Sequence, residues 1–371
     1  MDMGCVTKGR EKLKCGYTTG TCGAIAAKAA AQALFTGEAA ESAGIITPGG
    51  IYVQVPVVCI SRSASAVCCG VMKDGGDDPD ATHGLYIHAR VEKSGKGIII
   101  DGGKGVGRVT KPGLDQPVGA AAINSTPRRM IAAALEEVCR EHGYDGGLMV
   151  TIEVPDGEKT AKRTFNPHLG IVGGISILGT SGIVEPMSEK ALIDSIEIEM
   201  RQISMQGHRD IIITPGNYGR DFLSRDRGYS KLPVVKCSNF IGEALDFAAV
   251  YGFKNVLLIG HIGKFIKLAG GIMNTHSKTA DCRMELLALH GALKGAKPLV
   301  LTEILQSMTV DEGLSVLQRL GMMHEVMESL LKAAAAYVER RAGGSYGVGI
   351  VTFSNKLGLL GEIGRQPENW G

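Results

Sequence analysis

The sequence lacks the features that mark membrane, nucleic-acid-binding and secreted proteins. Its longest uncharged, largely apolar run, residues 169–184, has 16 residues with five glycines, too short to span a bilayer. Lys and Arg number 40 against 38 Asp and Glu, so no overall field attracts nucleic acid or an anionic membrane. An Ala-rich stretch follows the basic N-terminus, but Lys28 interrupts it and no cleavage site follows. These absences predict a cytoplasmic protein.

The nine cysteines show no pairing or metal-binding pattern. They are scattered, odd in number, and form neither a C-x-x-C pair nor a Cys/His spacing typical of zinc sites. The sequence therefore predicts reduced, mainly buried thiols and no protein-bound metal.

Glycine is the residue in excess. The chain has 52 glycines among 371 residues, about 14%, where about 7% is usual. They stand singly or in pairs between Val, Ile and Leu runs, and 44% of the residues are hydrophobic. This placement favours turns and close backbone approaches in a folded enzyme over disorder.

The length and the hydrophobic patterns predict two domains of α/β class. An α+β domain over residues 1–190 has helices at 24–37 and 126–142 and strands at 51–55, 85–91, 98–100 and 148–154. A second domain over residues 191–371 begins near a helix at 188–202 and alternates, with strands at 210–214, 234–236, 255–259 and 348–353 and a helix at 240–251. Three more helices precede the last strand, one opened by the capping box of Thr309 and Glu312. This alternation predicts a Rossmann-like doubly wound parallel sheet, covered on both faces.

The first domain holds a hydroxyl-rich turn and an acidic run. Thr18, Thr19 and Thr21 precede the Ala-rich helix, where they could bind a carboxylate or phosphate or simply cap the helix. Residues 74–80 carry four aspartates, followed by His83. The EF-hand spacing is absent, so we consider Asp78 or His83 as a general base, with an exposed acidic turn as the alternative.

The same domain has a glycine-rich loop after the strand at 98–100. Gly105 and Gly107 precede Arg108, a pattern that resembles the nucleotide loop of Rossmann-like methyltransferases. However, Pro112 prevents a helix from starting where that loop requires one. The three residues remain candidates for a phosphate or carboxylate cradle.

Two strands of the second domain end in glycine-bearing loops. The candidate cofactor-binding residues there are Thr214, Gly216 and Asn217 after one strand, and Gly260, His261 and Gly263 after another. Ligands of open α/β sheets lie beyond the carboxyl ends of strands, which both loops follow. The glycine spacing before Lys264 does not match the phosphate-binding loop of ATPases.

Cationic side chains cluster just after the second of these loops. We take Lys264, Lys267, Lys278 and Arg283 as candidates to bind an anion with several carboxylates. A solvated basic helix is the alternative interpretation, which the small residues at 269–271 weaken because they favour close packing or close ligand approach.

Seven segments then follow one another in a recognisable order within residues 13–362: 16–22, 77–83, 105–113, 166–180, 214–219, 236–242 and 260–281. Together they resemble the cobalt-precorrin-5B C(1)-methyltransferase family. The resemblance implies two α/β domains and a role in anaerobic cobalamin synthesis. There, S-adenosylmethionine would methylate C-1 of cobalt-precorrin-5B, a small-molecule cobalt tetrapyrrole, to give cobalt-precorrin-6A.

The resemblance fits the cationic cluster, because the macrocycle carries acetate and propionate arms. It also implies that cobalt arrives with the substrate and that neither nucleic acid nor a membrane takes part in the reaction. A homo-oligomer and contacts with other enzymes of the pathway are compatible with it. From the residues alone, two alternatives stay open: a nucleotide-dependent transferase or ligase, and a non-catalytic tetrapyrrole carrier.

Overall fold

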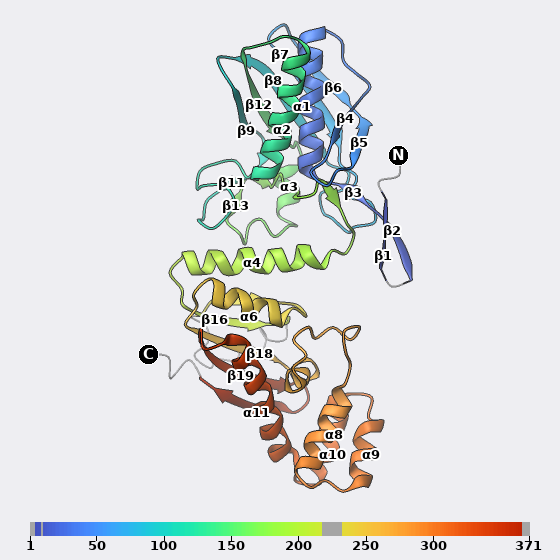
Figure 1. Cartoon of the computed structure of the whole chain (residues 1–371), viewed down its shortest axis with the longest axis vertical. Helices are drawn as coiled ribbons and strands as arrows, with labels where there is room; N and C mark the ends of the chain where they lie inside the picture. The colour runs from blue at the N-terminus through green and yellow to red at the C-terminus, as the bar shows by residue number, and fades with distance from the viewer. Residues whose placement is uncertain (1–3, 9, 217–231, 366–371) are drawn as a thin grey trace. The chain divides into compact units, whose positions relative to one another are not determined.

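The computed structural model describes residues 4–8, 10–216 and 232–365 (Figure 1). It divides the chain into two compact units, Met1–Ser188 and Glu189–Gly371. Each unit has a sheet and a large hydrophobic core of its own.

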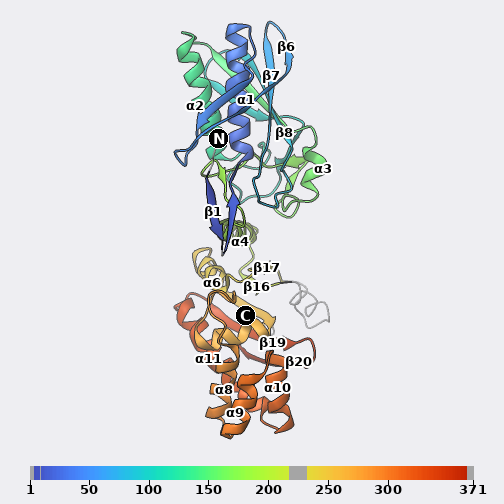
Figure 2. The same ribbon diagram turned by 90° about the vertical axis from the view of Figure 1, so that its right-hand side faces the viewer.

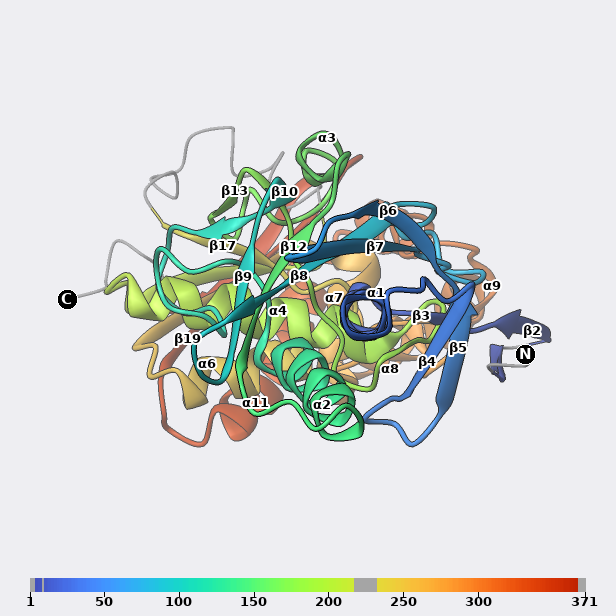
Figure 3. The same ribbon diagram turned by 90° about the horizontal axis from the view of Figure 1, so that it is seen from above.

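A five-stranded sheet forms the centre of the first unit. Its order is β6 (Val58–Arg62), β7 (Ala66–Met72), β8 (Tyr86–Ser94), β12 (Gly147–Glu153) and β9 (Ile98–Gly102). Neighbouring strands are antiparallel, except that β12 and β9 run parallel. Helices α1 (Thr19–Thr36) and α2 (Ser125–Glu141) lie side by side against the sheet (Figure 3). Alanine provides most of the buried side chains of α1, so the helix can approach its neighbours closely.

Short strand pairs complete the first unit. β1 (Cys5–Lys8) and β2 (Glu11–Lys14) form one hairpin, and β4 (Ser42–Ile46) and β5 (Tyr52–Pro56) form another. β3 (Gly16–Tyr17) pairs with β15 (Ile183–Val184), β10 (Gly105–Val106) with β14 (Gly174–Ile175), and β11 (Arg108–Val109) with β13 (Ile171–Val172). A short helix, α3 (Gly157–Ala161), packs near β10 and β14.

The second unit contains the sheet that positions the candidate site. Its order is β17 (Val234–Lys236), β16 (Asp210–Thr214), β18 (Asn255–His261), β19 (Gly347–Ser354) and β20 (Gly358–Gly364). The first four strands are parallel and β20 is antiparallel. Ile211 and Ile213 of β16 face the larger core, whereas Ile212 between them faces a smaller cluster on the opposite side.

The described helices of the second unit all contribute to the larger core. They are α4 (Glu189–Met205), α6 (Ile241–Val250), α7 (Ile262–Phe265), the 3₁₀ helix η2 (Ile266–Gly270), α8 (Arg283–Leu293), α9 (Pro298–Gln306), α10 (Val310–Arg319) and α11 (Met323–Ala342). Helices α8, α9 and α10 pack together as a group (Figure 2).

The predicted α/β class is confirmed, and the strands expected at 210–214 and 234–236 have those bounds. Two expectations need correction. Four long helices, not three, lie between β18 and β19, and the antiparallel strand β20 was not predicted.

The capping box at Thr309 and Glu312 is present, and all nine cysteines are free, five of them buried. No helix within the described residues is long and apolar enough to cross a membrane.

Candidate active site

A cavity of about 740 Å³ opens in the second unit where the strand order reverses. Strand β17, which follows β16 in the chain, lies on one side of β16, and the next strand, β18, lies on the other side. The order in which the chain adds strands to the sheet therefore reverses at β16. In parallel α/β sheets such a switch point, at the carboxyl ends of the strands, is where ligands bind. The cavity is lined by Thr214, Pro215, Gly216, Gly260, His261, Gly263, Lys264, Arg283, Thr309, Val310 and Asp311.

The loop after β16 forms one wall of the cavity. Thr214 is fully buried, and its hydroxyl donates a hydrogen bond to the Gly216 carbonyl oxygen at 3.3 Å, which stabilises the turn. A Cβ at Gly216 would have no described atom within 4 Å. No described residue therefore crowds the backbone at Gly216. The predicted cofactor-binding residue Asn217 lies outside the described residues.

The end of β18 and the short helix α7 that follows it directly form the facing wall, where the sequence predicted a loop. The His261 Nδ1 atom accepts a hydrogen bond from the Gly263 backbone N–H at 3.1 Å, which caps α7. Burial lowers the pKa of His261, and the nearby Asp311 carboxylate opposes this shift. The Nδ1 lone pair of His261 is therefore already used. Gly260 has a structural reason to be glycine, because a Cβ there would lie 2.2 Å from the Phe265 ring.

Two cationic side chains line the same cavity. Lys264 is half-buried, and burial lowers the pKa of its ammonium group. Arg283 donates hydrogen bonds from its Nε and Nη2 atoms to the two carboxylate oxygens of Asp281, at 2.5 and 3.0 Å. Its charge is therefore largely balanced by a neighbour, whereas no ion pair to Lys264 occurs among the described residues.

The N-terminus of α10 supplies the remaining polar lining. Thr309 caps the helix by accepting a hydrogen bond from the Glu312 backbone N–H at 3.2 Å. The Glu312 carboxylate is in turn bound by the backbone N–H groups of Met308 and Thr309. Asp311, in the same first turn, also lines the cavity, and its Oδ1 atom is buried and makes no hydrogen bond among the described residues. The site thus joins two glycine loops, a lysine and an unpartnered carboxylate oxygen.

Comparison with known proteins identifies the family. Residues 6–186 match the CbiD family model and residues 274–364 match the CbiD C-terminal domain. A relative from Ruminiclostridium cellulolyticum, named cobalt-precorrin-5B C(1)-methyltransferase, is 49% identical over 94% of this chain and 91% of its own length. The chain belongs to the CbiD family. Relatives of the same name from Thermoanaerobacter sp. and Alkaliphilus metalliredigens are 49% and 42% identical, covering 84% and 96% of this chain and 84% and 93% of their own lengths.

A solved structure of the family has also been compared with this chain. It is described as the cobalamin biosynthesis protein cbiD from Archaeoglobus fulgidus, and it is 30% identical, covers 74% of this chain and 86% of its own, and gives a TM-score of 0.41. The family resemblance expected from the sequence motifs is confirmed by the family matches and by the curated relatives.

Of the four cationic residues predicted to bind substrate, the CbiD fold brings two, Lys264 and Arg283, to the cavity. Lys267 is 2% exposed, and its ammonium group donates hydrogen bonds to the carbonyl oxygens of Ala280 at 2.7 Å and Thr275 at 3.1 Å. It therefore links the loop before α8 to η2, and the structure gives Lys267 a packing role in place of a position at the cavity. Lys278 is exposed and does not line the cavity.

The hydroxyl-rich turn of the first unit is a helix cap, which was the simpler of its two interpretations. The Thr18 hydroxyl accepts a hydrogen bond from the Thr21 backbone N–H at 3.2 Å. Thr21 is fully buried and donates to the Gly182 carbonyl oxygen at 2.7 Å, while the Thr19 hydroxyl accepts from the Leu178 backbone N–H at 3.0 Å. Neighbouring chain segments thus satisfy the hydroxyls of Thr18, Thr19 and Thr21, whose substrate contacts stay a prediction.

The predicted glycine cradle is likewise a packing feature. A Cβ at Gly105 would lie 1.8 Å from the Val154 carbonyl oxygen, and one at Gly107 would lie 2.3 Å from Ile171. The Arg108 guanidinium binds both oxygens of Asp101, at 2.7 and 3.0 Å, and holds the pKa of that carboxyl below its ordinary value. Gly105 and Gly107 therefore allow close approach of the chain, and Arg108 is held by a neighbouring acid, while their binding of substrate stays a prediction.

The acidic run folds into a bonded loop between β7 and β8. His83 is 56% exposed, but its Nδ1 atom accepts a hydrogen bond from the Gly75 backbone N–H at 3.0 Å, which assigns the ring proton to Nε2. The Nδ1 lone pair of His83 is therefore engaged in the described structure. Asp78 accepts a hydrogen bond from the Met187 backbone N–H at 2.9 Å. No cluster of three or more His, Cys, Asp or Glu side chains suited to a metal occurs in the described part of the chain.

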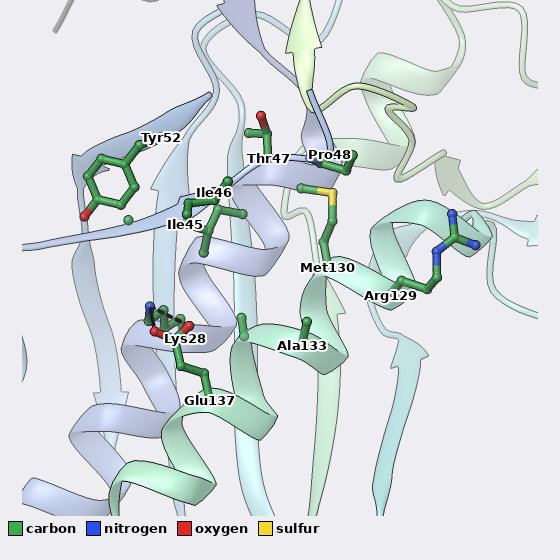
Figure 4. Close-up of a pocket in the computed structure, with 12 residues that line it drawn as sticks. Lys28, Ile45, Ile46, Thr47, Pro48, Tyr52, Arg129, Met130, Ala133 and Glu137 are labelled. Atoms are coloured by element: carbon green, nitrogen blue, oxygen red, sulfur yellow. Dashed lines mark hydrogen bonds and ion pairs between the residues drawn. The ribbon is translucent and has the colours of Figure 1, made fainter. Parts of the chain in front are cut away.

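A second cavity, of about 430 Å³, lies in the first unit among α1, α2 and the β4–β5 hairpin (Figure 4). Lys28 of α1 contacts Glu137 of α2 across the two helices, with Nζ to oxygen distances of 2.9 and 3.0 Å. Tyr52 comes from the hairpin and Arg129 from α2. None of the site residues predicted from the sequence lines this cavity.

Sequence reasoning missed Asp311 and Thr309 of the first cavity. Their signal in the sequence was a capping box, which identifies a helix start but not its proximity to the strand ends at His261 and Thr214, 48 and 95 residues before Thr309.

Proposed function

We propose that this chain is a methyltransferase that uses S-adenosylmethionine to methylate C-1 of cobalt-precorrin-5B, yielding cobalt-precorrin-6A. The observation that carries the proposal is its relationship to curated relatives of that name over nearly the whole chain. Both family models match parts of the chain, one in each unit, which supports a shared activity rather than one shared domain.

We place S-adenosylmethionine in the cavity of the second unit. The cavity lies at the switch point of the sheet, and its volume falls within the range of roughly 300–1,000 Å³ typical of small-molecule sites. The unpartnered oxygen of Asp311 and the open backbone at Gly216 both fit a ligand there. When bound, S-adenosylmethionine supplies an electrophilic methyl group on a sulfonium sulfur.

The residues of the chain act mainly by positioning. Transfer of a methyl group needs the donor and the acceptor carbon held in line, and fixed geometry of this kind provides a large part of a rate enhancement. The loops after β16 and β18 are fixed by their own hydrogen bonds, from Thr214 and to His261. Lys278 and Arg283, which lie on or after the loop that follows η2, are our candidates for the carboxylate arms of the substrate. We assign no base to His83, because its Nδ1 atom is engaged.

The first experiment is a thermal shift of the full chain with S-adenosylhomocysteine. A ligand at 100 times its dissociation constant stabilises the folded protein by about 2.7 kcal/mol. The proposal expects a clear rise in Tm with this ligand and transfer of labelled methyl from S-adenosylmethionine to cobalt-precorrin-5B. A nucleotide-dependent transferase would instead respond to ATP with Mg²⁺, and a tetrapyrrole carrier would bind only the macrocycle. Either pattern would contradict the proposal.

A second experiment locates the binding site. Gly216→Val places a branched side chain beside the cavity without a described clash, so we expect at least tenfold weaker S-adenosylhomocysteine binding in a folded protein. Gly95→Val is the matched control, since Gly95 also has no atom within 4 Å and no positive φ but lies in the first unit. Equal affinity of the two variants would remove the cavity from the proposal. Gly260→Val is a poor test because it disturbs Phe265.

A further inference from the structure

The cavity of the second unit contains two opposite charges that do not pair with each other. The Oδ1 atom of Asp311 is buried and makes no hydrogen bond among the described residues. The Lys264 ammonium group, on the short helix α7 that follows β18, makes no hydrogen bond or ion pair with any described residue. Both side chains line the same cavity. A buried polar atom without a partner costs free energy, so each of these groups is suited to a partner that arrives with a ligand.

The other charged residues at the cavity are already occupied. The Asp281 carboxylate binds the Arg283 guanidinium through two hydrogen bonds. The Glu312 carboxylate, next to Asp311 in the first turn of α10, is used in the capping box. Among the charged groups that line the cavity, the Lys264 ammonium group and the Asp311 Oδ1 atom are therefore the two without a hydrogen-bonded partner in the described part of the chain.

The position of Asp311 explains how a half-buried carboxylate is kept without a counter-ion. It lies in the first turn of α10, where the aligned backbone dipoles favour a negative charge. Lys264 has no such compensation, and burial lowers the pKa of its ammonium group. A carboxylate from a ligand would relieve that cost, and an ammonium group would satisfy Asp311.

We propose that Asp311 and Lys264 form a recognition site for an α-amino acid zwitterion, with Asp311 accepting from the α-ammonium group and Lys264 donating to the α-carboxylate. The inference rests on the proposed function, because it assigns the methionine end of S-adenosylmethionine to these two residues. It makes both of them binding and specificity residues for the amino-acid part of the ligand. The nucleoside part lies elsewhere in the cavity.

The test compares two ligands that differ in this one group. S-adenosylhomocysteine has the zwitterion, whereas methylthioadenosine has the same nucleoside and sulfur without it. Both are titrated into the full chain by calorimetry, for the wild type, Asp311→Asn and Lys264→Met. We expect each variant to bind S-adenosylhomocysteine at least tenfold more weakly and methylthioadenosine within twofold of the wild type. If Lys264→Met does not fold, Lys264→Gln replaces it.

Matched controls test whether charge removal alone has this effect. Glu325→Gln removes an acid from the first turn of α11, and Lys297→Met removes an exposed lysine next to α9. Both should bind the two ligands as the wild type does.

Three outcomes would overturn the inference. Variants that bind S-adenosylhomocysteine like the wild type would show that neither charge contacts it. An equal loss for both ligands would place Asp311 or Lys264 at the nucleoside or in general packing. A wild type that binds neither ligand would refute the proposed function itself, and this inference with it.

Discussion

Gly105 provides the sharpest test of whether the glycines of the first unit serve packing or a ligand. Its φ is +74°, and a Cβ would lie 1.8 Å from the Val154 carbonyl oxygen and 3.2 Å from the Gly157 Cα. Neither neighbour is a flexible side chain, so the backbone itself must move in Gly105→Ala. Gly173 has a similar φ, +83°, but no atom within 4 Å of its Cβ position.

The two alanine variants therefore separate conformation from crowding. A left-handed conformation costs an L-residue about 1–2 kcal/mol, and overpacking a closely packed site costs about 1–3 kcal/mol more. We expect Gly173→Ala to lose only the first amount and Gly105→Ala the sum, about 2–5 kcal/mol. Hydrogen exchange of buried β8 and β12 amides in increasing urea reads this unfolding free energy within the full chain. If Gly105→Ala were no less stable than Gly173→Ala but raised the KM for the tetrapyrrole, the packing explanation would be refuted.

Two further predictions concern buried lysines. Lys267→Met removes two charged hydrogen bonds to the Thr275 and Ala280 carbonyl oxygens, so we expect the free energy of unfolding of the second unit to fall by roughly 2–4 kcal/mol in a urea titration. Unchanged stability together with a higher substrate KM would instead indicate that Lys267 contacts the substrate. Burial alone would raise the pKa of Asp80, but the Lys73 ammonium and the hydrogen bonds from Lys73 and Thr82 outweigh it and lower that pKa. The stabilisation that results is complete above about pH 4 and is lost as the pH falls through the lowered pKa of Asp80. In Asp80→Asn we therefore expect the free energy of unfolding to fall less steeply with decreasing pH than in the wild type. Parallel pH profiles of the free energy of unfolding for the variant and the wild type would contradict this.

The second unit was more predictable from sequence than the first. β16 and β17 appear as uninterrupted β-branched runs, and such runs are typical of strands buried on both faces. β20 was missed because Gly358, Gly361 and Gly364 interrupt its pattern, although it pairs with β19 along its length. In the first unit, β7 is rich in small residues and cysteine, which carry little strand signal.

Some residues of the candidate site could likewise be predicted from the sequence, and others could not. The loops at Gly216 and Gly260 were predicted because both directly follow strands, and the rule for ligands at strand ends is local in sequence. Asp311 could not be found this way, because only the folded chain brings the start of α10 to the end of β18. The threonines at 18–21 and Gly105 show the converse case. Their residue types suit an anion, but partners distant in sequence, such as Gly182 and Val154, already satisfy or crowd them.

The most direct measurement is a crystal structure of the full chain with S-adenosylhomocysteine. The account predicts the ligand between the loops at 214–216 and 260–264, with its amino-acid end between Asp311 and Lys264. Ligand bound instead in the cavity of the first unit, beside Lys28 and Tyr52, would contradict the assignment of the active site.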